Sequence, residues 1–159
     1  MANVTIITVG SLKEGYLREA VAEYKKRLSQ YARVDEVELK EERINDENNR
    51  TEIESALSKE ADKIIAAIPK DALKIALCVE GKQYTSEELA KLVGDGNDRG
   101  GKIAFVIGSS YGLSEKVKKE CDVRLSFSKL TFPHQLMKVV LFEAVYRSFT
   151  ILHGKRYHK

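Results

Sequence analysis

The stretch Ile103-Ala-Phe-Val-Ile107 decides the fold class, because a continuous apolar run of this kind suits a strand that is covered on both faces. Two further runs of apolar or β-branched residues, Val4–Val9 and Leu73–Val79, are typical of strands as well. Between these runs apolar residues recur at helical spacing, for example over residues 17–28. Strands that alternate with helices indicate an α/β fold with a mostly parallel sheet and helices on both faces.

The same patterns predict the remaining elements. Further strands are expected at residues 32–39 and 123–127, and further helices at residues 53–68, 85–93 and 134–152. Loops are expected at residues 41–50, 80–85 and 108–112, and a glycine-rich turn at residues 94–101. Thr85 and Glu88 have the spacing of a capping box that begins a helix.

The composition indicates one globular domain, residues 1–159. The chain has 43% hydrophobic and 32% charged residues, which is the balance of a folded protein. Val4–Val9 lacks the flanks of a signal peptide, and no apolar run approaches the roughly 20 residues of a membrane span. We therefore expect a cytoplasmic protein with no membrane partner, in which Cys78 and Cys121 are free thiols.

Charge is distributed unevenly along the chain. Residues 35–62 carry 11 acidic and 4 basic side chains, whereas residues 102–159 carry 4 acidic and 11 basic ones. A basic segment is the expected footprint of a nucleic-acid backbone, because lysine and arginine replace the counterions of phosphates. Solvated helix faces would give the same asymmetry, so charge alone leaves both interpretations open.

Several common ligand motifs are missing from the chain. Ligands of open α/β sheets bind at the carboxyl ends of strands, which directs attention to residues 80–85, 108–112 and 127–134. The turn after the first strand, Gly10-Ser-Leu-Lys-Glu-Gly15, lacks the glycine spacing of a dinucleotide site. There is also no P-loop, no G-x-S-x-G nucleophile turn and no recognisable metal-ligand spacing, so we expect no metal.

Three segments resemble a known family: Phe105-Val-Ile-Gly108, Phe127-Ser-Lys-Leu-Thr-Phe-Pro-His-Gln135 and Tyr157-His-Lys159. The chain is similar, from Val9 to its last residue, to the SPOUT-class ribosomal RNA large subunit methyltransferase H family, which methylates N-3 of a pseudouridine in 23S rRNA. The resemblance implies a C-terminal trefoil knot, a homodimer and S-adenosyl-L-methionine as the cofactor. It implies as substrate pseudouridine 1915, in the usual rRNA numbering, in helix 69 of assembled ribosomes.

The resemblance also implies where the cofactor binds. Its pocket falls on Leu77, on Gly108 and on one loop after the last strand. The loop consists of Phe127, Ser128, Lys129, Leu130, Thr131 and Phe132. Gly108 would let the backbone approach a ligand closely, or would simply form a turn, and the loop's amide and carbonyl groups could hold the adenine edge. The chain departs from many relatives at Ser109, where they have a second glycine.

The candidate catalytic residues are His134, Glu143, Arg147, Tyr157 and His158. An imide nitrogen must lose its proton to be methylated, so a base or cationic donors should lie near it. His134 begins a helix, whose dipole favours the neutral imidazole, and it could accept a proton, orient the base or cap the helix. Glu143 and Arg147 have the spacing of an ion pair, which could be purely structural.

The last helix and the tail point to a dimer. Apolar residues surround most of the helix, which favours burial on more than one side, by a partner or by the core. By resemblance, Tyr157 and His158 would reach the partner's pocket, while Lys155, Arg156 and Lys159 would grip phosphate. Lys129 could contact RNA or the cofactor carboxylate. Without the resemblance, the tail would be a frayed terminus.

Two other functions remain open at this point. One is a non-catalytic RNA- or nucleotide-binding module of the same fold, an alternative that Ser109 supports. The other is a dinucleotide-dependent redox enzyme, which the missing glycine fingerprint disfavours.

Overall fold

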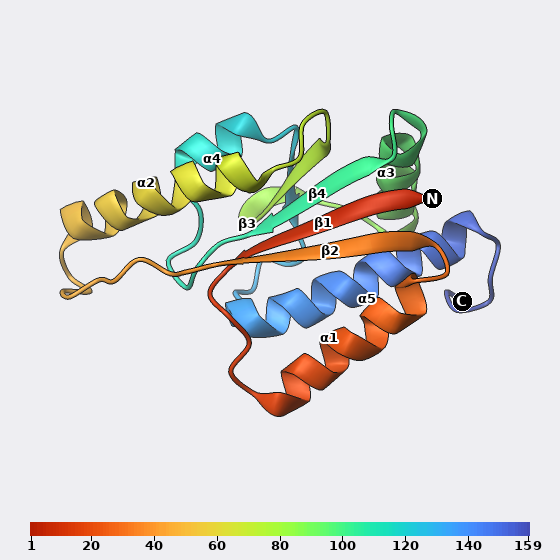
Figure 1. Cartoon of the computed structure of the whole chain (residues 1–159), viewed down its shortest axis with the longest axis horizontal. Coiled ribbons are helices and arrows are strands. Elements are labelled where there is room, and N and C mark those ends of the chain that lie inside the picture. Colours follow the sequence, from red (N-terminus) through yellow and green to blue (C-terminus); the bar gives the residue numbers. More distant parts are fainter.

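The computed structural model describes all 159 residues and alternates strands with helices along the chain (Figure 1). The strands are β1 (Ala2–Val9), β2 (Ala32–Leu39), β3 (Leu73–Gln83), β4 (Lys102–Ile107) and β5 (Val123–Ser126). The helices are α1 (Gly15–Leu28), α2 (Arg50–Ala67), α3 (Ser86–Asp98), α4 (Glu115–Glu120) and α5 (His134–Leu152). All strand pairs are parallel, in the order β2-β1-β4-β3-β5, which confirms the predicted α/β fold.

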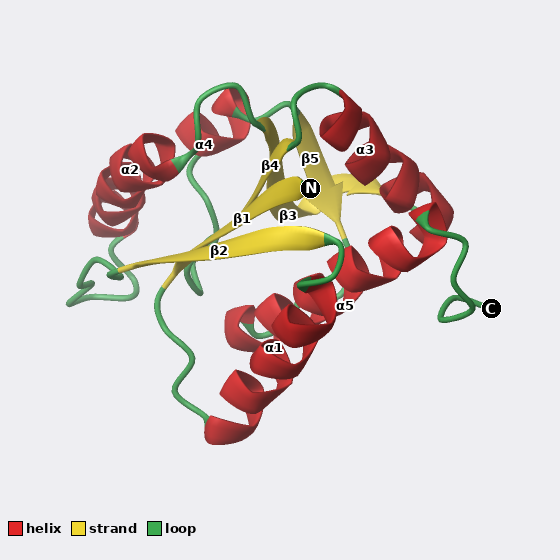
Figure 2. Ribbon diagram, turned by 45° about the vertical axis from the view of Figure 1, so that its right-hand side comes forward, coloured by secondary structure: helices red, strands yellow, loops and turns green.

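The helices form a layer on each face of the sheet (Figure 2). Helices α1, α3 and α5 cover one face, where 20 buried residues form the larger hydrophobic cluster. Helices α2 and α4 cover the other face with a cluster of 8 buried residues. Strand β4 lies in the middle, with Phe105 in the larger cluster and Val106 in the smaller one. This two-sided burial explains why the strand is apolar at consecutive positions.

Strand β3 is longer than the sequence predicted. Residues 80–85 were expected to form a loop, but the strand continues to Gln83. Leu125 of β5 lies opposite both Leu77 and Lys82, so residues 78–81 lie outside the regular ladder. A side chain at Gly81 would come within 2.7 Å of the Arg124 carbonyl oxygen. The crowding against β5 therefore requires glycine at position 81.

The predicted glycine-rich turn is partly wrong, because Gly94 and Gly96 belong to α3. A methyl group at Gly96 would lie 2.9 Å from the side chains of Leu73 and Ile103, and one at Gly94 would lie 3.0 Å from Leu152. These two glycines allow α3 to pack closely on its neighbours, and tight packing overrides their low helix propensity. The capping box of Thr85 and Glu88 is confirmed.

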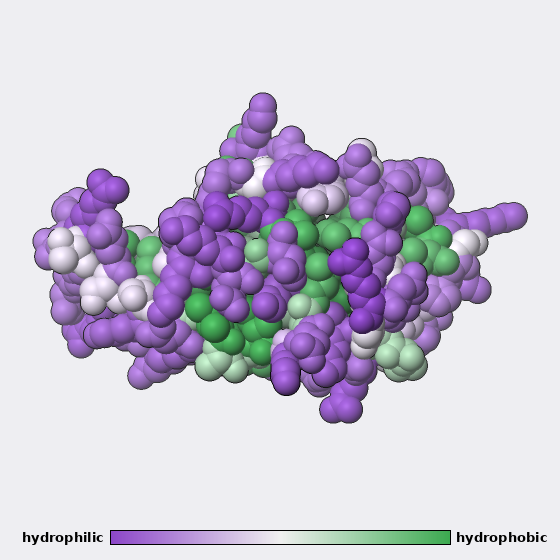
Figure 3. All heavy atoms as spheres, turned by 90° about the horizontal axis from the view of Figure 1, so that it is seen from above, coloured by the Kyte–Doolittle hydropathy of each residue, from purple (hydrophilic) through white to green (hydrophobic).

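The surface shown in Figure 3 is mostly hydrophilic, with apolar groups visible between polar side chains near its middle. The exposed large apolar side chains of the whole chain include Tyr16, Val79, Leu130 and Leu136. None of the helices combines the length and the apolar character that a membrane span requires.

Candidate functional site

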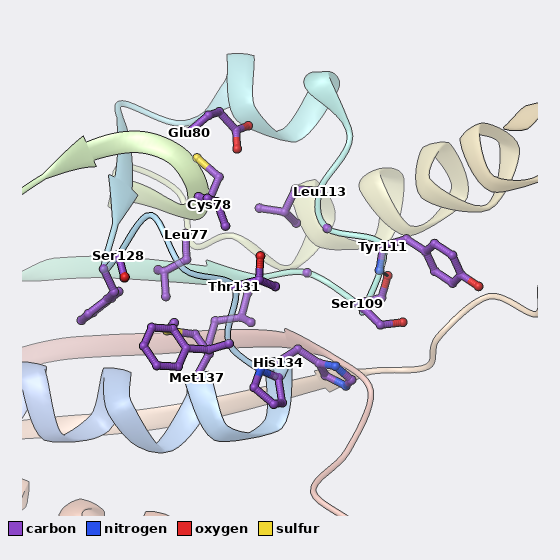
Figure 4. A pocket seen from close by; sticks show the side chains of 18 of the residues that line it. Leu77, Cys78, Glu80, Ser109, Tyr111, Leu113, Ser128, Thr131, His134 and Met137 are labelled. Atoms are coloured by element: carbon purple, nitrogen blue, oxygen red, sulfur yellow. Dashed lines mark hydrogen bonds between the residues drawn. The ribbon is translucent and has the colours of Figure 1, made fainter. Parts of the chain in front are cut away.

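A cavity of about 620 Å³ opens beside the carboxyl ends of β3, β4 and β5 (Figure 4). This volume is typical of sites for small molecules, and the position is the usual one in open α/β sheets. The lining comes from residues 77–80 after the regular part of β3, from residues 107–113 after β4, and from the segment between β5 and α5. Three turns that are far apart in sequence therefore converge on one cavity.

Most of the predicted cofactor residues line this cavity. They are Leu77, Gly108, Phe127, Ser128, Leu130, Thr131 and Phe132. Lys129 belongs to the same loop but is exposed and does not line the cavity. Leu130 lines it with a side chain that is 73% exposed, which places this residue at the rim.

The loop between β5 and α5 has a defined shape with free backbone groups. The Ser126 hydroxyl donates to the Ser128 carbonyl oxygen at 3.0 Å, and the Leu130 amide donates to the Ser128 hydroxyl at 3.0 Å. The amides of Lys129, Thr131 and Phe132 donate to no other group of the chain. Free donors and acceptors on a loop with apolar neighbours suit the edge of a planar heterocycle such as adenine.

Gly108 is explained by the turn that follows β4. A side chain at Gly108 would lie 2.6 Å from the carbonyl carbon of Gly112 and 2.9 Å from Leu113. The Gly112 amide donates to the Ser109 carbonyl at 2.8 Å, and Gly112 has a φ of 85°. The turn itself thus occupies the space beside Gly108. This favours the interpretation that Gly108 forms a turn over the interpretation that it lets a ligand approach the backbone.

One wall of the cavity carries an ion pair and a partly buried thiol. The carboxylate of Glu80 binds the ammonium group of Lys118, which lowers the pKa of Glu80. Burial raises the pKa of Cys78, which also lines the cavity, and raises that of Cys121 to about 11. Both cysteines therefore remain uncharged thiols at neutral pH and are poor nucleophiles.

His134 is the predicted catalytic residue that lines the cavity. It is the first residue of α5, and no side chain caps this helix. The imidazole forms no hydrogen bond within the chain, so the alternative that His134 caps the helix is not observed. Its two ring nitrogens are free to bind a ligand.

Lys138 lies one turn after His134 and is almost completely buried. Its ammonium group pairs with Glu36 at 2.9 Å and Glu38 at 3.1 Å, both on β2. Burial acts to raise the pKa of Glu36, but hydrogen bonds from Lys138 and Lys25 outweigh it and lower this pKa. The pairing fixes the first turns of α5 against the sheet, because a buried cation requires its partners.

The other predicted catalytic residues form a separate cluster at the far end of α5. The predicted ion pair is confirmed, since Arg147 donates twice to Oε1 of Glu143, at 2.9 and 2.5 Å. The hydroxyl of Tyr157 donates to the same oxygen at 3.1 Å, and Arg147 lies over the Tyr157 ring. Burial, together with Tyr24 and Glu143, raises the pKa of Tyr157 to about 12. Tyr157 is therefore a hydrogen-bond donor at neutral pH.

Both ring nitrogens of His158 are engaged in this cluster. Nδ1 lies 3.1 Å from Nη1 of Arg147, and Nε2 lies 2.8 Å from Oε1 of Glu87 on α3. A guanidinium group can only donate, so we assign the proton to Nε2 and the lone pair to Nδ1. In this arrangement His158 has no free lone pair to accept a substrate proton. Glu87 was not among the predicted residues, because nothing in the local sequence indicates that α3 meets the tail.

The two groups of predicted catalytic residues do not meet within one chain. His134 and Arg147 are 13 residues apart on α5, which corresponds to about 20 Å along the helix. No residue beyond Met137 lines the cavity. The tail of the chain therefore lies away from the cavity of the same chain.

Comparison with known proteins identifies the family. A family model described as "Predicted SPOUT methyltransferase" matches residues 2–158. A protein of Shouchella clausii named ribosomal RNA large subunit methyltransferase H is 48% identical over 158 residues, 99% of each chain. Proteins of the same name from Exiguobacterium sp. and Caldicellulosiruptor saccharolyticus are 49% and 45% identical, over 99% and 98% of this chain and 99% of each relative. The chain belongs to the SPOUT methyltransferases, in the family of ribosomal RNA large subunit methyltransferase H.

Proposed function

We propose that this protein methylates N-3 of a pseudouridine in 23S rRNA, at position 1915 in helix 69 of assembled ribosomes, with S-adenosyl-L-methionine as the methyl donor. The observation that carries the proposal is the convergence of three turns on one cavity in a chain of this family. Full-length relatives named for methylation of large-subunit rRNA support the substrate class. We further propose that the enzyme works in the cytoplasm as a homodimer.

The cavity fits the proposed cofactor in size and chemistry. S-adenosyl-L-methionine, when bound, supplies an electrophilic methyl group. The free backbone amides of Lys129, Thr131 and Phe132 would hold the adenine edge, and Leu77 and Phe127 would cover its faces. The 108–112 turn would close the opposite side of the site.

His134 is the best-placed group to manage the acceptor proton. The N-3 position of pseudouridine carries an imide proton that must leave before or during methylation. The His134 side chain lines the cavity with both ring nitrogens free, whereas both nitrogens of His158 are engaged.

The separation of the two residue groups supports a site shared between two subunits. One nucleotide cannot contact groups that are about 20 Å apart on one helix. In a homodimer built along α5, the Glu143, Arg147, Tyr157 and His158 cluster of one subunit would lie near the cavity of the other. We propose that the tail reaches the partner in this way, and that the C-terminal part of the chain forms a trefoil knot.

The RNA backbone would bind lysine and arginine side chains that have no other role in the chain. Lys129, Lys155, Arg156 and Lys159 are exposed and form no ion pair. Phosphate contacts by such residues release counterions and make binding depend strongly on salt. Lys129, on the loop beside the cavity, and the three tail residues would then grip the strand on either side of the target base.

A mixing experiment tests the composite site. A variant whose 108–112 turn is disrupted, Gly108→Val, and a variant lacking residues 155–159 should each be inactive in methyl transfer to ribosomes. Random mixing should restore about a quarter of wild-type activity, because half of the dimers are mixed and each has one complete site. Mass spectrometry of the rRNA should place the methyl group on one pseudouridine. If the mixture is as inactive as each variant alone, the site is not shared between subunits. If the wild-type protein does not bind S-adenosyl-L-methionine, the alternative of a non-catalytic RNA-binding module is favoured instead.

A further inference from the structure

The wall of the cavity contains one pair of opposite charges, Glu80 on β3 and Lys118 on α4. Both residues line the cavity, and the Lys118 ammonium group donates to Oε1 of Glu80. No other aspartate, glutamate, lysine or arginine lines it, and His134 is the one histidine that does. Two full charges therefore meet at one place on a wall that is otherwise neutral and largely apolar.

Lys118 is held at the cavity by carboxylates on two elements. Its side chain is only 13% exposed, although a lysine on a surface helix can extend its ammonium group into water. Glu115, one turn earlier on α4, lies 3.7 Å from this ammonium group and 3.5 Å from a guanidinium nitrogen of Arg124 on β5. Neither Glu115 nor Arg124 lines the cavity. This chain of alternating charges fixes Lys118 from outside the cavity and keeps its ammonium group in the wall.

Both members of the pair can still bind a ligand. An ammonium group has three donors, and the ammonium group of Lys118 meets two carboxylates. A carboxylate has two oxygens, and Lys118 binds Oε1 of Glu80. The Glu80 side chain is also 55% exposed. A ligand that carries one charge of each sign can therefore bind beside the pair without breaking it.

We infer that Glu80 and Lys118 form the subsite for the charged amino-acid end of the methyl donor, with Lys118 binding the α-carboxylate and Glu80 binding the α-ammonium group. The inference rests on the proposed function of the cavity. S-adenosyl-L-methionine joins a planar nucleoside to a zwitterionic amino acid. The nucleoside requires apolar surfaces and a few hydrogen bonds, whereas the amino acid requires two opposite charges held side by side.

The position of the pair fits this division of the ligand. The adenine edge is proposed to bind the loop of residues 127–132, whereas Glu80 and Lys118 belong to β3 and α4. In Figure 4 Glu80 lies on one side of the cavity and His134 on the other. His134 is therefore left for the acceptor nucleotide while the pair holds the donor. Lys129 does not line the cavity, which makes Lys118 the better candidate for the donor's carboxylate.

Calorimetric titration of the full-length protein with three ligands tests the inference. S-adenosyl-L-methionine carries both charges of the amino-acid end, its decarboxylated form carries only the ammonium group, and 5′-methylthioadenosine lacks this end altogether. Lys118→Met should weaken binding of S-adenosyl-L-methionine roughly tenfold, and should weaken binding of the other two ligands by no more than about twofold. Glu80→Gln should weaken binding of both ligands with an ammonium group roughly tenfold and spare 5′-methylthioadenosine.

Glu115→Gln is the matched control, because Glu115 pairs with Lys118 but does not line the cavity. It should bind all three ligands within about twofold of the wild type. If Lys118→Met fails to fold, Glu80→Gln, which keeps the shape of its side chain, provides the same comparison between ligands.

An equal loss of affinity for S-adenosyl-L-methionine and 5′-methylthioadenosine in either variant would overturn the inference, since the pair would then only maintain the shape of the cavity. Unchanged affinity of both variants for S-adenosyl-L-methionine would overturn it as well. A wild-type protein that binds none of the three ligands would instead refute the proposed function.

Discussion

Replacement of Glu143 by glutamine probes the cluster at the end of α5. One carboxylate oxygen accepts two hydrogen bonds from Arg147 and one from Tyr157, with the Glu143 side chain 25% exposed. Glutamine keeps an acceptor but loses the charge, and charge-assisted bonds are about twice as strong as neutral ones. With roughly 1.5–3 kcal/mol for each bond to a charged group, halving the Tyr157 bond, which is the one that holds the tail, costs up to about 1.5 kcal/mol.

This loss is large relative to the free energy of the few contacts that dock the tail. Residues 155, 156 and 159 are exposed, so Tyr157 and His158 supply most of the contacts that dock the tail. About 1.5 kcal/mol corresponds to roughly a tenfold change in the docked fraction. We expect kcat/KM for ribosome methylation to fall about tenfold and the melting temperature by roughly 3–6 °C.

Radiolabelled methyl transfer to ribosomes measures the kinetic effect, and calorimetry measures binding of S-adenosyl-L-methionine. That binding should stay within about twofold of wild type, because the cluster lies outside the cavity of its own chain. Glu54→Gln is the control, since Glu54 forms the same type of pair with Arg50 on an exposed face of α2. Unchanged kcat/KM in a variant with a lowered melting temperature would refute a catalytic role for the docked tail.

Three further changes test other parts of the structure. Gly108→Ala should weaken S-adenosyl-L-methionine binding at least tenfold in calorimetry, because the methyl group collides with Gly112. Gly15→Ala should not, because its methyl group would make only an ordinary contact with Arg18 at 3.7 Å, and equal affinities of the two variants would contradict the turn geometry. Lys138→Met should cost about 2 kcal/mol in urea unfolding. It should also flatten the loss of stability as the pH falls below about 5. The lowered pKa of Glu36 stabilises the fold above the pKa of the unfolded chain, and this contribution is lost as the pH falls through the lowered value, so an unchanged pH profile would refute the pairing. Deletion of residues 155–159 should abolish methylation and spare cofactor binding; normal turnover would exclude the tail from the reaction.

The sequence was informative wherever local pattern and burial agree. The apolar run of β4 is apolar because both faces are covered, and the Glu143–Arg147 pair forms because helical spacing alone brings the two side chains together. The turns that line the cavity were also predicted, since the carboxyl ends of parallel strands share one edge. Their use in binding a cofactor stays a prediction that the calorimetry tests.

The errors arose where tertiary contacts decide the local structure. Gly94 and Gly96 were assigned to a turn by composition, but their role is to let α3 approach Leu152 and Ile103. The extension of β3 to Gln83 depends on pairing with β5, which no local pattern encodes. Glu87 gave no signal either, because an isolated glutamate on a helix looks the same whether it meets water or a distant segment such as the tail.

The unequal division of the core between the two faces of the sheet affects local opening. Helices α2 and α4 are held by far fewer buried apolar residues than α1, α3 and α5, so we expect their amide hydrogens to exchange with solvent first. Lys118 of α4 lines the cavity and pairs with Glu80 on β3, so each opening of α4 would loosen one wall of the cavity. A molecule bound in the cavity should therefore slow hydrogen exchange in α4.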